Sequence, residues 1–406
     1  MVQETITLEG HIIDSDVLRR VMGKIVAEGA SFEIEEFRVG RTNEEPSFAR
    51  LAVSAADPLQ LDRLLEALSY LGAESQVRDA AFAPAEADGI LPDEFYSSTN
   101  LATFVRASGR WREVNGQRMD CAVVRRGDEL VCVKQRKVRR GEPVLLRGAG
   151  VRVRPEERAR AASSFGFMSN EISMEVNKPI AIAAAARTLR DARAEGRRIA
   201  LVPGPAVIHS GGDAPLARLI RAGWVDVVLT GNAFAVHDLE KALLRSSLGV
   251  CQMSGRAVEG GSRNHLWAIN AVNRAGGIRA AVASGLVRSG VMFELVERDV
   301  PFVLAGSIRD DGPLVDVITD VLAAQEAYTA ALEGVGACLM LASALHAIAV
   351  GNLLPASVRT VCVDMTEALP VKLGNRGTQH AIGLVTDAGY FLERLEHELV
   401  PREGPS

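Results

Sequence analysis

Short apolar runs alternate with stretches of helical pattern from about residue 195 to the end of the chain. Each run is rich in aliphatic and β-branched residues and ends in small or polar ones. Runs of this kind, without alternating polar residues, are typical of strands that are buried on both faces of a sheet. Helices between such strands predict right-handed βαβ crossovers, and therefore an α/β fold with a doubly wound parallel sheet. The six runs are 199–202, 225–229, 301–305, 337–341, 361–363 and 382–385.

Residues 1–82 show a different pattern, in which strands of alternating polarity are separated by two amphipathic helices. The order β-α-β-β-α-β predicts a small ferredoxin-like α+β module. In its second strand the apolar alternation changes phase after Ile34, so we expect a bulge near Glu35-Glu36. Asp14 or Ser15 is the expected cap of the first helix. The predicted strands are 5–12, 31–39, 47–54 and 74–78, and the predicted helices are 17–28 and 58–71.

Residues 83–160 are predicted to hold a linker followed by a small β-rich domain, and residues 161–406 the α/β domain. The linker assignment depends on the stretch 82–96, which is rich in Pro and Ala. A basic run at 134–140 has no interleaved aromatic residues for base stacking, so it is interpreted as a solvated hairpin face. The predicted strands of this region are 102–105, 118–125, 129–134, 143–146 and 150–154.

The composition of the chain favours a cytoplasmic protein. Its net charge of −5 gives no general attraction to nucleic acid or to an anionic membrane. The first residues show no secretory signal, and no apolar stretch reaches membrane-spanning length. The five cysteines form no CxxC pair, which favours a reducing compartment and disfavours a disulfide framework or a zinc site. We therefore expect no nucleic-acid partner, no membrane partner and no metal.

Polar residues follow the predicted strands of the C-terminal half, at the edge where parallel sheets bind ligands. Asn232 and Ala233 follow one strand and begin a helix, so their backbone amides are placed to meet a phosphate. Asp364 directly follows another strand, where a carboxylate can accept both hydroxyls of a ribose. Asp387 follows the last strand and is placed to face a nicotinamide or a substrate. The other strand-end residues are Asp311 and the run Ser343, Ala344, Leu345 and His346.

The chain lacks the glycine fingerprint that is usual in dinucleotide sites. Gly334-Val335-Gly336 precedes a predicted strand instead of following one, so it does not qualify as the start of a GxGxxG motif. A dinucleotide site in this chain must therefore belong to a different α/β type.

Two polar clusters, at 207–213 and 259–265, interrupt otherwise aliphatic sequence. Their glycines allow the backbone to approach a ligand closely. Each cluster contains a histidine, so His209 and His265 are candidates for general acid–base catalysis. A helix-capping or buried structural role explains either histidine equally well.

Several motifs resemble those of the archaeal-type ornithine cyclodeaminase family, among them PGPAVIHSGG, LTGNAFAVHDLE, VEGGSRNHLWAINAVNRAGGI and CLMLASALHAIAVGNLLP. That family is similar to a region of the plant lysine-ketoglutarate reductase/saccharopine dehydrogenase bifunctional enzyme. It is also similar to the C-terminal part of the cyanobacterial arginine dihydrolase/ornithine cyclodeaminase. The resemblance covers nearly the whole chain. It implies a NAD-binding domain of the deoxyhypusine-synthase type, which would account for the missing GxGxxG.

The resemblance also implies a reaction, the conversion of L-ornithine to L-proline and ammonia with NAD as a catalytic cofactor. NAD is favoured over NADP because Asp364 would repel a 2′-phosphate. The reaction requires a base, for which His209, His265 and Asp387 are the catalytic candidates. The candidates for substrate binding are Arg263, Asn264 and Lys178. The residues implied to hold NAD are Asn232, Ala233, Asp311, Ser343, Ala344, Leu345, His346, Asp364, Asp387 and Ala388.

Two other functions stay open at this point. A NAD-dependent oxidoreductase of another diamino or imino acid, of opine or saccharopine type, is one of them. It is suggested by Cys251 and Trp267, which stand where the family is expected to have an acidic and a basic residue. The other is a non-catalytic sensor of NAD or of an amino acid that uses the N-terminal module. In each case we expect a homo-oligomer, because Ala-rich helices suit close packing and sheets of the implied type commonly assemble.

Overall fold

The computed structural model describes residues 2–10, 12–13, 16–40, 45–75, 78–154, 178–247, 250–251, 264–310, 312–375 and 381–400. The chain divides into two compact units. The first holds the described residues up to 154 together with Asn352–Ser357, and the second holds the other described residues. Among the described helices, none combines the length and the hydropathy that a membrane span needs.

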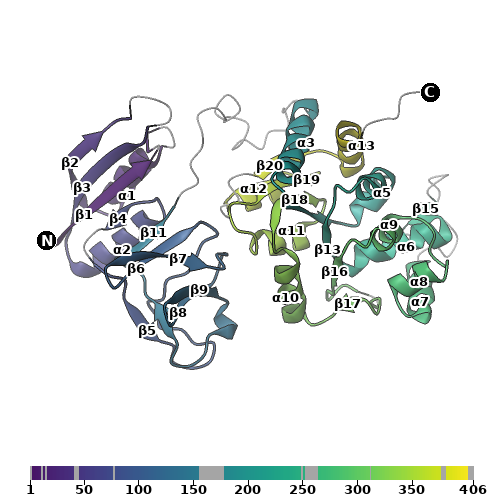
Figure 1. Ribbon diagram of the computed structural model, residues 1–406, viewed down its shortest axis with the longest axis horizontal. Helices are drawn as coiled ribbons and strands as arrows, with labels where there is room; N and C mark the ends of the chain where they lie inside the picture. Colours follow the sequence, from purple (N-terminus) through teal and green to yellow (C-terminus); the bar gives the residue numbers. More distant parts are fainter. Residues whose placement is uncertain are drawn as a thin grey trace. The chain divides into compact units, whose positions relative to one another are not determined.

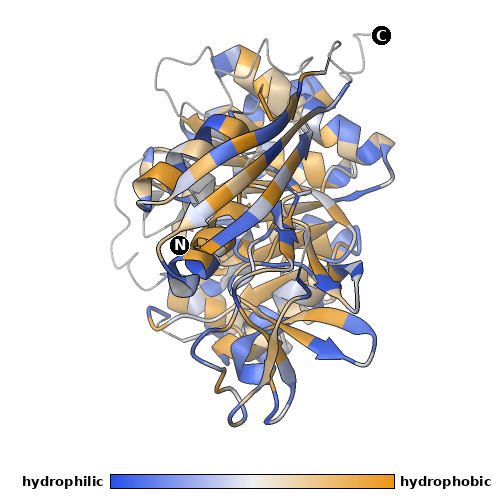
Figure 2. Ribbon diagram, turned by 90° about the vertical axis from the view of Figure 1, so that its left-hand side faces the viewer, coloured by the Kyte–Doolittle hydropathy of each residue, from blue (hydrophilic) through white to orange (hydrophobic). Residues whose placement is uncertain are grey.

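The first unit begins with an antiparallel sheet and two helices. Its elements are β1 (Val2–Gly10), α1 (Val17–Ala27), β2 (Ser31–Arg38), β3 (Ser47–Ala55), α2 (Pro58–Ser69) and β4 (Glu74–Ser75). The strand order β2-β3-β1-β4 is that of a ferredoxin-like module, as predicted. The register shifts between Ile34 and Glu36, which confirms the expected bulge. Figure 2 shows hydrophilic and hydrophobic residues alternating along these strands.

The predicted caps of α1, Asp14 and Ser15, lie outside the described residues. Asp16 is the residue at the N-cap, and it has a left-handed backbone with φ of 60° and no side-chain cap bond. The helix is held instead by its apolar face, from which Val17, Val21 and Ile25 pack into the core against the sheet.

The rest of the first unit is a second sheet of mixed direction. Its strands are β5 (Phe82–Pro84), β6 (Thr103–Ala107), β7 (Arg110–Asn115), β8 (Ala122–Arg126), β9 (Glu129–Val133), β10 (Pro143–Leu145) and β11 (Val151–Val153), with a short 3-10 helix η1 (Gln135–Lys137). Their order is β11-β6-β7-β9-β8-β10-β5. Five of the seven strands were predicted. Strand β5 lies at the start of the predicted linker and pairs with β10. The domain boundaries at 82/83 and 160/161 stay predictions.

Parallel strands form the main sheet of the second unit. They are β12 (Arg198–Pro203), β13 (Val227–Gly231), β16 (Phe302–Ala305), β17 (Val317–Ile318), β18 (Val335–Leu341), β19 (Arg359–Asp364) and β20 (Ala381–Val385). Their order is β17-β16-β13-β12-β18-β19-β20, and every described pairing among them is parallel. All six predicted strands are present, which confirms the predicted α/β fold. The additional strand, β17, lies at one edge.

Helices pack on both faces of this parallel sheet (Figure 1). They are α3 (Lys178–Ala194), α4 (Ala206–His209), α5 (Asp213–Arg221), α6 (Asn232–Leu244), α7 (Asn264–Ala275), α8 (Ile278–Ala283), α9 (Val291–Glu297), α10 (Val321–Ala331), α11 (Ala344–Gly351), α12 (Ala368–Asn375) and α13 (Ala388–Leu399), and a small hairpin joins β14 (Ser246–Ser247) to β15 (Val250–Cys251). In β12, Leu201 lies in the core with α3, α5 and α13, while Ala200 and Val202 are buried on the opposite face. Both faces are covered, and the strand sequences are therefore apolar throughout.

Candidate active site

The strand order of the parallel sheet reverses between β12 and β18. The chain continues from β12 toward one edge and from β18 toward the other. Ligands of such sheets bind at this point, beside the carboxyl ends of the strands. Here the two following loops touch, because a Cβ added at Gly204 would lie 1.8 Å from the carbonyl oxygen of Ala342. Ala342 has a left-handed backbone with φ of 47°, which is uncommon for a residue other than glycine. We call the loops after the parallel strands the carboxyl edge.

His346 lies against the end of β13. A Cβ added at Gly231 would be 2.4 Å from its Nε2. On the other side of the ring, Nδ1 lies 3.1 Å from the hydroxyl of Tyr328, which donates to the carbonyl oxygen of Thr230 at 2.6 Å. The hydroxyl has a single proton, so it accepts a hydrogen bond from Nδ1 of His346. Burial lowers the pKa of His346 and favours the neutral ring, which leaves Nε2 as an acceptor beside Gly231.

Asn232 and Ala233 lie at the start of α6, directly after β13, as predicted. Asn232 is buried, and its side-chain oxygen accepts a hydrogen bond of 3.1 Å from the backbone N–H of Leu314. This bond ties the loop after β16 to the start of α6. Ala233 is exposed, and the N–H groups of the first helical turn have no acceptor within the helix, so they can face an anion. Asp311 lies outside the described residues.

Two of the predicted carboxylates lie at the carboxyl ends of β19 and β20: Asp364 is the last residue of β19, and Asp387 follows β20 by two residues. Oδ1 of Asp364 accepts from the N–H and the hydroxyl of Thr366 at 2.9 and 3.0 Å. Within the described residues its Oδ2 has no partner, so this oxygen is placed to accept from a ligand. Oδ1 of Asp387 accepts from the N–H of Tyr390 at 2.9 Å and caps α13, whose first residue is the buried Ala388. One oxygen of Asp387 is therefore held by a structural bond.

The loops after β12 and β20 also meet, although β18 and β19 separate these strands in the sheet. A Cβ added at Gly389 would lie 2.3 Å from the carbonyl oxygen of Ser210. Ser210 follows His209 at the end of α4. The close approach of the two backbones thus brings the start of α13 beside the first polar cluster.

Three large apolar side chains stand exposed at the carboxyl edge. Ile308 follows β16, Leu345 follows β18 and Met365 follows β19, with exposed fractions of 107%, 64% and 66%. Leu345 is the second residue of α11 and follows Ala344, which is also exposed, whereas Ser343 is buried. Exposed apolar side chains after three of the parallel strands are unusual next to polar strand ends and suit contact with an apolar or planar group.

A polar network extends from His209 into α6. The rings of His209 and His237 meet edge to face, with centroids 4.8 Å apart and planes at 65°. Nδ1 of His237 lies 3.4 Å from Oε2 of Glu240, and Oε1 of Glu240 accepts from the hydroxyl of Ser246 at 2.9 Å. The side-chain amide of Asn264 donates to the same hydroxyl at 2.6 Å. The network therefore joins a predicted base, His209, to a predicted substrate residue, Asn264.

The other predicted catalytic and substrate residues are placed less closely. His265 follows Asn264 on α7. Lys178 is exposed at the start of α3. Since α3 leads into β12 and runs antiparallel to it over a length of about 25 Å, Lys178 lies toward the carboxyl edge. Arg263 lies outside the described residues.

Sequence reasoning missed three residues that the structure places beside the predicted ones: His237, Glu240 and Tyr328. A signal for the first two was present. They stand three residues apart, and therefore on one face, of a helix that also carries a long apolar face, and a charge on such a helix is buried only when it has a partner. Tyr328 gave no signal of this kind, because its contacts to Thr230 and His346 join separate strands and helices.

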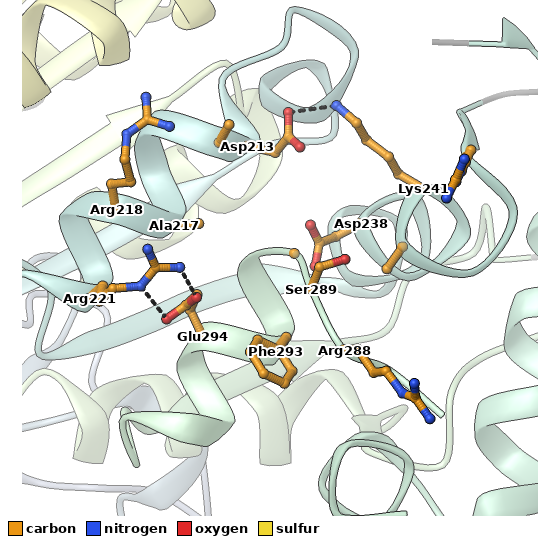
Figure 3. A pocket seen from close by; sticks show the side chains of 14 residues that line it. Asp213, Ala217, Arg218, Arg221, Asp238, Lys241, Arg288, Ser289, Phe293 and Glu294 are labelled. Atoms are coloured by element: carbon orange, nitrogen blue, oxygen red, sulfur yellow. Dashed lines mark hydrogen bonds and ion pairs between the residues drawn. The ribbon is translucent and has the colours of Figure 1, made fainter. Parts of the chain in front are cut away.

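A pocket of about 560 Å³ lies between α5, α6 and α9 (Figure 3). Three of its cations, Arg218, Arg221 and Lys241, are paired with acids on neighbouring helices. Lys241 donates to Asp213 at 2.8 Å, and Arg221 is bonded to Glu294. Because these charges satisfy one another, and because none of the predicted NAD residues lines the pocket, we place the dinucleotide candidate site at the carboxyl edge instead.

Comparison with known proteins decides the family. Residues 182–395 match the Rossmann-fold region at the C-terminus of ArgZ-like arginine dihydrolases, and residues 102–182 match the first region of the same C-terminal part. Residues 3–101 match the conserved region of the LOR/SDH bifunctional enzyme. A protein of Methanopyrus kandleri named ornithine cyclodeaminase is 46% identical over 401 residues, which are 98% of this chain and 97% of the relative. The chain belongs to the archaeal-type ornithine cyclodeaminase family.

Other members of the ornithine cyclodeaminase family agree with this placement. The ornithine cyclodeaminase of Archaeoglobus fulgidus is 45% identical and is covered over 96% of either chain. The crystal structure of the cyanobacterial arginine dihydrolase ArgZ has a TM-score of 0.84 at 36% identity, over 98% of this chain and 58% of ArgZ. AgrE, solved as a ternary complex with ornithine and NAD⁺, has a TM-score of 0.54 at 40% identity, and this chain spans 57% of its length.

Proposed function

We propose that the chain is a NAD-dependent ornithine cyclodeaminase, an ammonia-lyase that converts L-ornithine to L-proline and ammonia. One observation carries the proposal. Strand-end residues that are distant in sequence meet at the switch point of a parallel sheet, in a chain that is 40% identical to a protein solved with ornithine and NAD⁺.

The residues at the carboxyl edge fit a dinucleotide. Oδ2 of Asp364 suits the hydroxyls of a ribose, and its charge disfavours the extra phosphate of NADP. The first turn of α6, at Asn232 and Ala233, suits the pyrophosphate. Nε2 of His346 is an acceptor beside the end of β13, and the exposed apolar side chains beside it suit flat rings. Asp311, Ser343, Asp387 and Ala388 complete the proposed set.

When bound, NAD⁺ would accept a hydride from the α-carbon of ornithine and return it to the cyclised imine to give proline, so the overall reaction is redox-neutral. The chain supplies the proton chemistry. Burial and the neighbouring His237 lower the pKa of His209, so its neutral ring can take a proton from the substrate ammonium. The Asn264 amide and the Lys178 ammonium bind the substrate carboxylate. Apolar side chains at the edge restrict water, which would hydrolyse an imine.

The proposal is tested with L-ornithine that carries deuterium on the α-carbon. We expect mass spectrometry to show labelled proline and one equivalent of ammonia, because the abstracted deuterium returns to the same molecule. The absorbance of NADH should stay flat. His209→Gln should lose about 10²–10⁴-fold in kcat if the imidazole is the base. Accumulating NADH with unlabelled oxo acid would contradict the proposal and favour an opine- or saccharopine-type oxidoreductase.

We also propose that the enzyme is a homo-oligomer of the cytoplasm. The four cysteines whose side chains the structure describes are free thiols and buried, which suits a reducing compartment. Light scattering on the purified chain measures its oligomeric state, and a monomer at micromolar concentration would contradict the first part of the proposal.

A further inference from the structure

Glu240 is a fully buried acidic residue, with an exposed fraction of 0%. A buried carboxylate is costly unless polar partners surround it. Among the described residues, the two carboxylate oxygens of Glu240 have different partners. One carboxylate oxygen faces Nδ1 of His237 at 3.4 Å, and the other accepts from the Ser246 hydroxyl at 2.9 Å.

Each partner leads to a residue of the proposed active site. The His237 ring meets the ring of His209 at a centroid distance of 4.8 Å. The Ser246 oxygen accepts from the Asn264 amide at 2.6 Å. Glu240 therefore stands between the proposed base and the proposed carboxylate-binding amide, which come from two different helices, α4 and α7.

We propose that Glu240 is a shared positioning residue of the active site: through His237 it orients the imidazole of His209, and through Ser246 it orients the amide of Asn264. The inference depends on the proposed function, because the proposed function assigns the base and the substrate-binding amide that Glu240 positions. It adds that one buried carboxylate sets the relative placement of both.

The charges around His209 give the proposal a directional test. Besides burial, a neighbouring His237 and Lys241 lower the pKa of His209, while the Glu240 carboxylate raises it. Lys241 is itself held by Asp213 at 2.8 Å (Figure 3). Removing the charge of Glu240 and removing the ring of His237 must therefore move the pKa of His209 in opposite directions.

The test uses the full chain with NAD⁺ and ¹³C-labelled histidine, with the His209 signal assigned by its loss in His209→Gln. Titration of the Cε1–H signals gives the pKa of His209. We expect Glu240→Gln to lower it and His237→Gln to raise it, with the acid limb of the kcat profile moving the same way. Glu294→Gln is the matched control, since Glu294 is also a buried, ion-paired acid on a neighbouring helix. It should lower stability and leave the pKa of His209 unchanged.

The second arm is tested by Ser246→Ala, which leaves the Asn264 amide without its acceptor. We expect KM for ornithine to rise about tenfold, with kcat and the pKa of His209 nearly unchanged. If Glu240→Gln and His237→Gln only lower the melting temperature and shift neither the pKa nor KM, the network is structural and the proposal is overturned. The deuterium experiment on the wild-type chain judges the proposed function separately, because the pKa readout requires no turnover.

Discussion

Within the described part of the chain, the hydroxyl of Tyr328 is the hydrogen-bond partner that sets the tautomer of His346. Tyr328→Phe removes the hydroxyl and leaves the Thr230 carbonyl and Nδ1 of His346 without their partner in a buried place. We expect the free energy of unfolding to fall by about 1–3 kcal/mol. The ¹⁵N shifts of the His346 ring should change from one tautomer to a mixture, and NAD⁺ should bind more weakly. A single unchanged tautomer would show that Tyr328 does not set it.

Gly231 is required by a contact and not by its backbone angles, since φ is −105°. Gly231→Ala would place a methyl group 2.4 Å from Nε2 of His346. We expect this overpacking to cost about 1–3 kcal/mol of stability and to displace the ring. In a His346→Ala background, Gly231→Ala should cost much less stability than it does in the wild type, because the ring that it meets is gone. Calorimetry of the wild type, the two single variants and the double variant gives the coupling energy. Additive losses would contradict the contact.

At the residue scale, the sequence predicted what each strand end could bind but not what each side chain touches. Asp364 was selected because it follows a strand, and in the structure one of its oxygens accepts from the backbone N–H and the hydroxyl of Thr366. Asp387 was selected for the same reason, and the structure uses one of its oxygens as a helix cap. Neither bond was predictable from the strand-end position, because each depends on where a following backbone N–H group points.

At the scale of elements, long apolar patterns were predictable and short or charged ones were not. All six strands of continuous apolar sequence are present in the parallel sheet. Strand β17 has two residues and β5 has three, too few for any periodicity. Strand β7 carries Arg110, Arg112 and Glu113, and it pairs through its backbone with β6. Such strands are held by hydrogen bonds to a neighbouring strand, so their own sequences do not predict them.

Helix α9 is anchored by a side chain of another helix. The carboxylate of Asp238, on α6, accepts from the N–H groups of Val291 and Met292 at 2.9 and 2.7 Å. Gly290, with φ of 105°, leaves room for it, since an added Cβ would lie 2.8 Å from the carboxylate. Burial raises the pKa of Asp238 to about 7, from an ordinary value of 3.8.

This anchor makes stability depend on pH with a defined sign. The folded chain keeps the Asp238 proton at pH values where the unfolded chain has released it, so the stability contribution of Asp238 falls from pH 3.8 to about 7. Asp238→Asn keeps the shape but offers one acceptor oxygen, and should lose about 1–3 kcal/mol through the unpaired N–H. Urea unfolding of both proteins across this range gives the comparison. The free energy of unfolding of the wild type minus that of the variant should decrease as pH rises, and an increase would contradict the assignment.

At the scale of the whole molecule, each compact unit has its own hydrophobic core. A ligand that binds at the carboxyl edge therefore stabilises the second unit directly. We expect NAD⁺ to slow hydrogen exchange in peptides that cover 231–236, 342–348 and 364–368. Peptides that cover 103–154 in the first unit serve as the internal control and should exchange at the same rate with and without NAD⁺. Protection confined to the first unit would place the site elsewhere.

The division of the chain into two units was only partly predictable from the sequence. Composition and strand order gave the ferredoxin-like module and the parallel sheet, because both have regular patterns. The segment Asn352–Ser357 belongs to the first unit although it lies between α11 and β19 of the second. A local sequence pattern does not predict such a return. The backbone N–H of Ala356 donates a hydrogen bond of 2.9 Å to the carbonyl oxygen of Asn100, and any residue other than proline could make it.

Where β12 and β18 part, two stretches of main chain touch with no side chain between them, at Gly204 and Ala342. A molecule resting there meets peptide groups, whose chemistry is the same whichever amino acids flank them. The sequences of the surrounding loops can therefore change to suit diamino acids of other lengths, while this backbone contact is kept. Attempts to change the substrate preference of this enzyme have most to gain in the loop tips, and least at this meeting of two backbones.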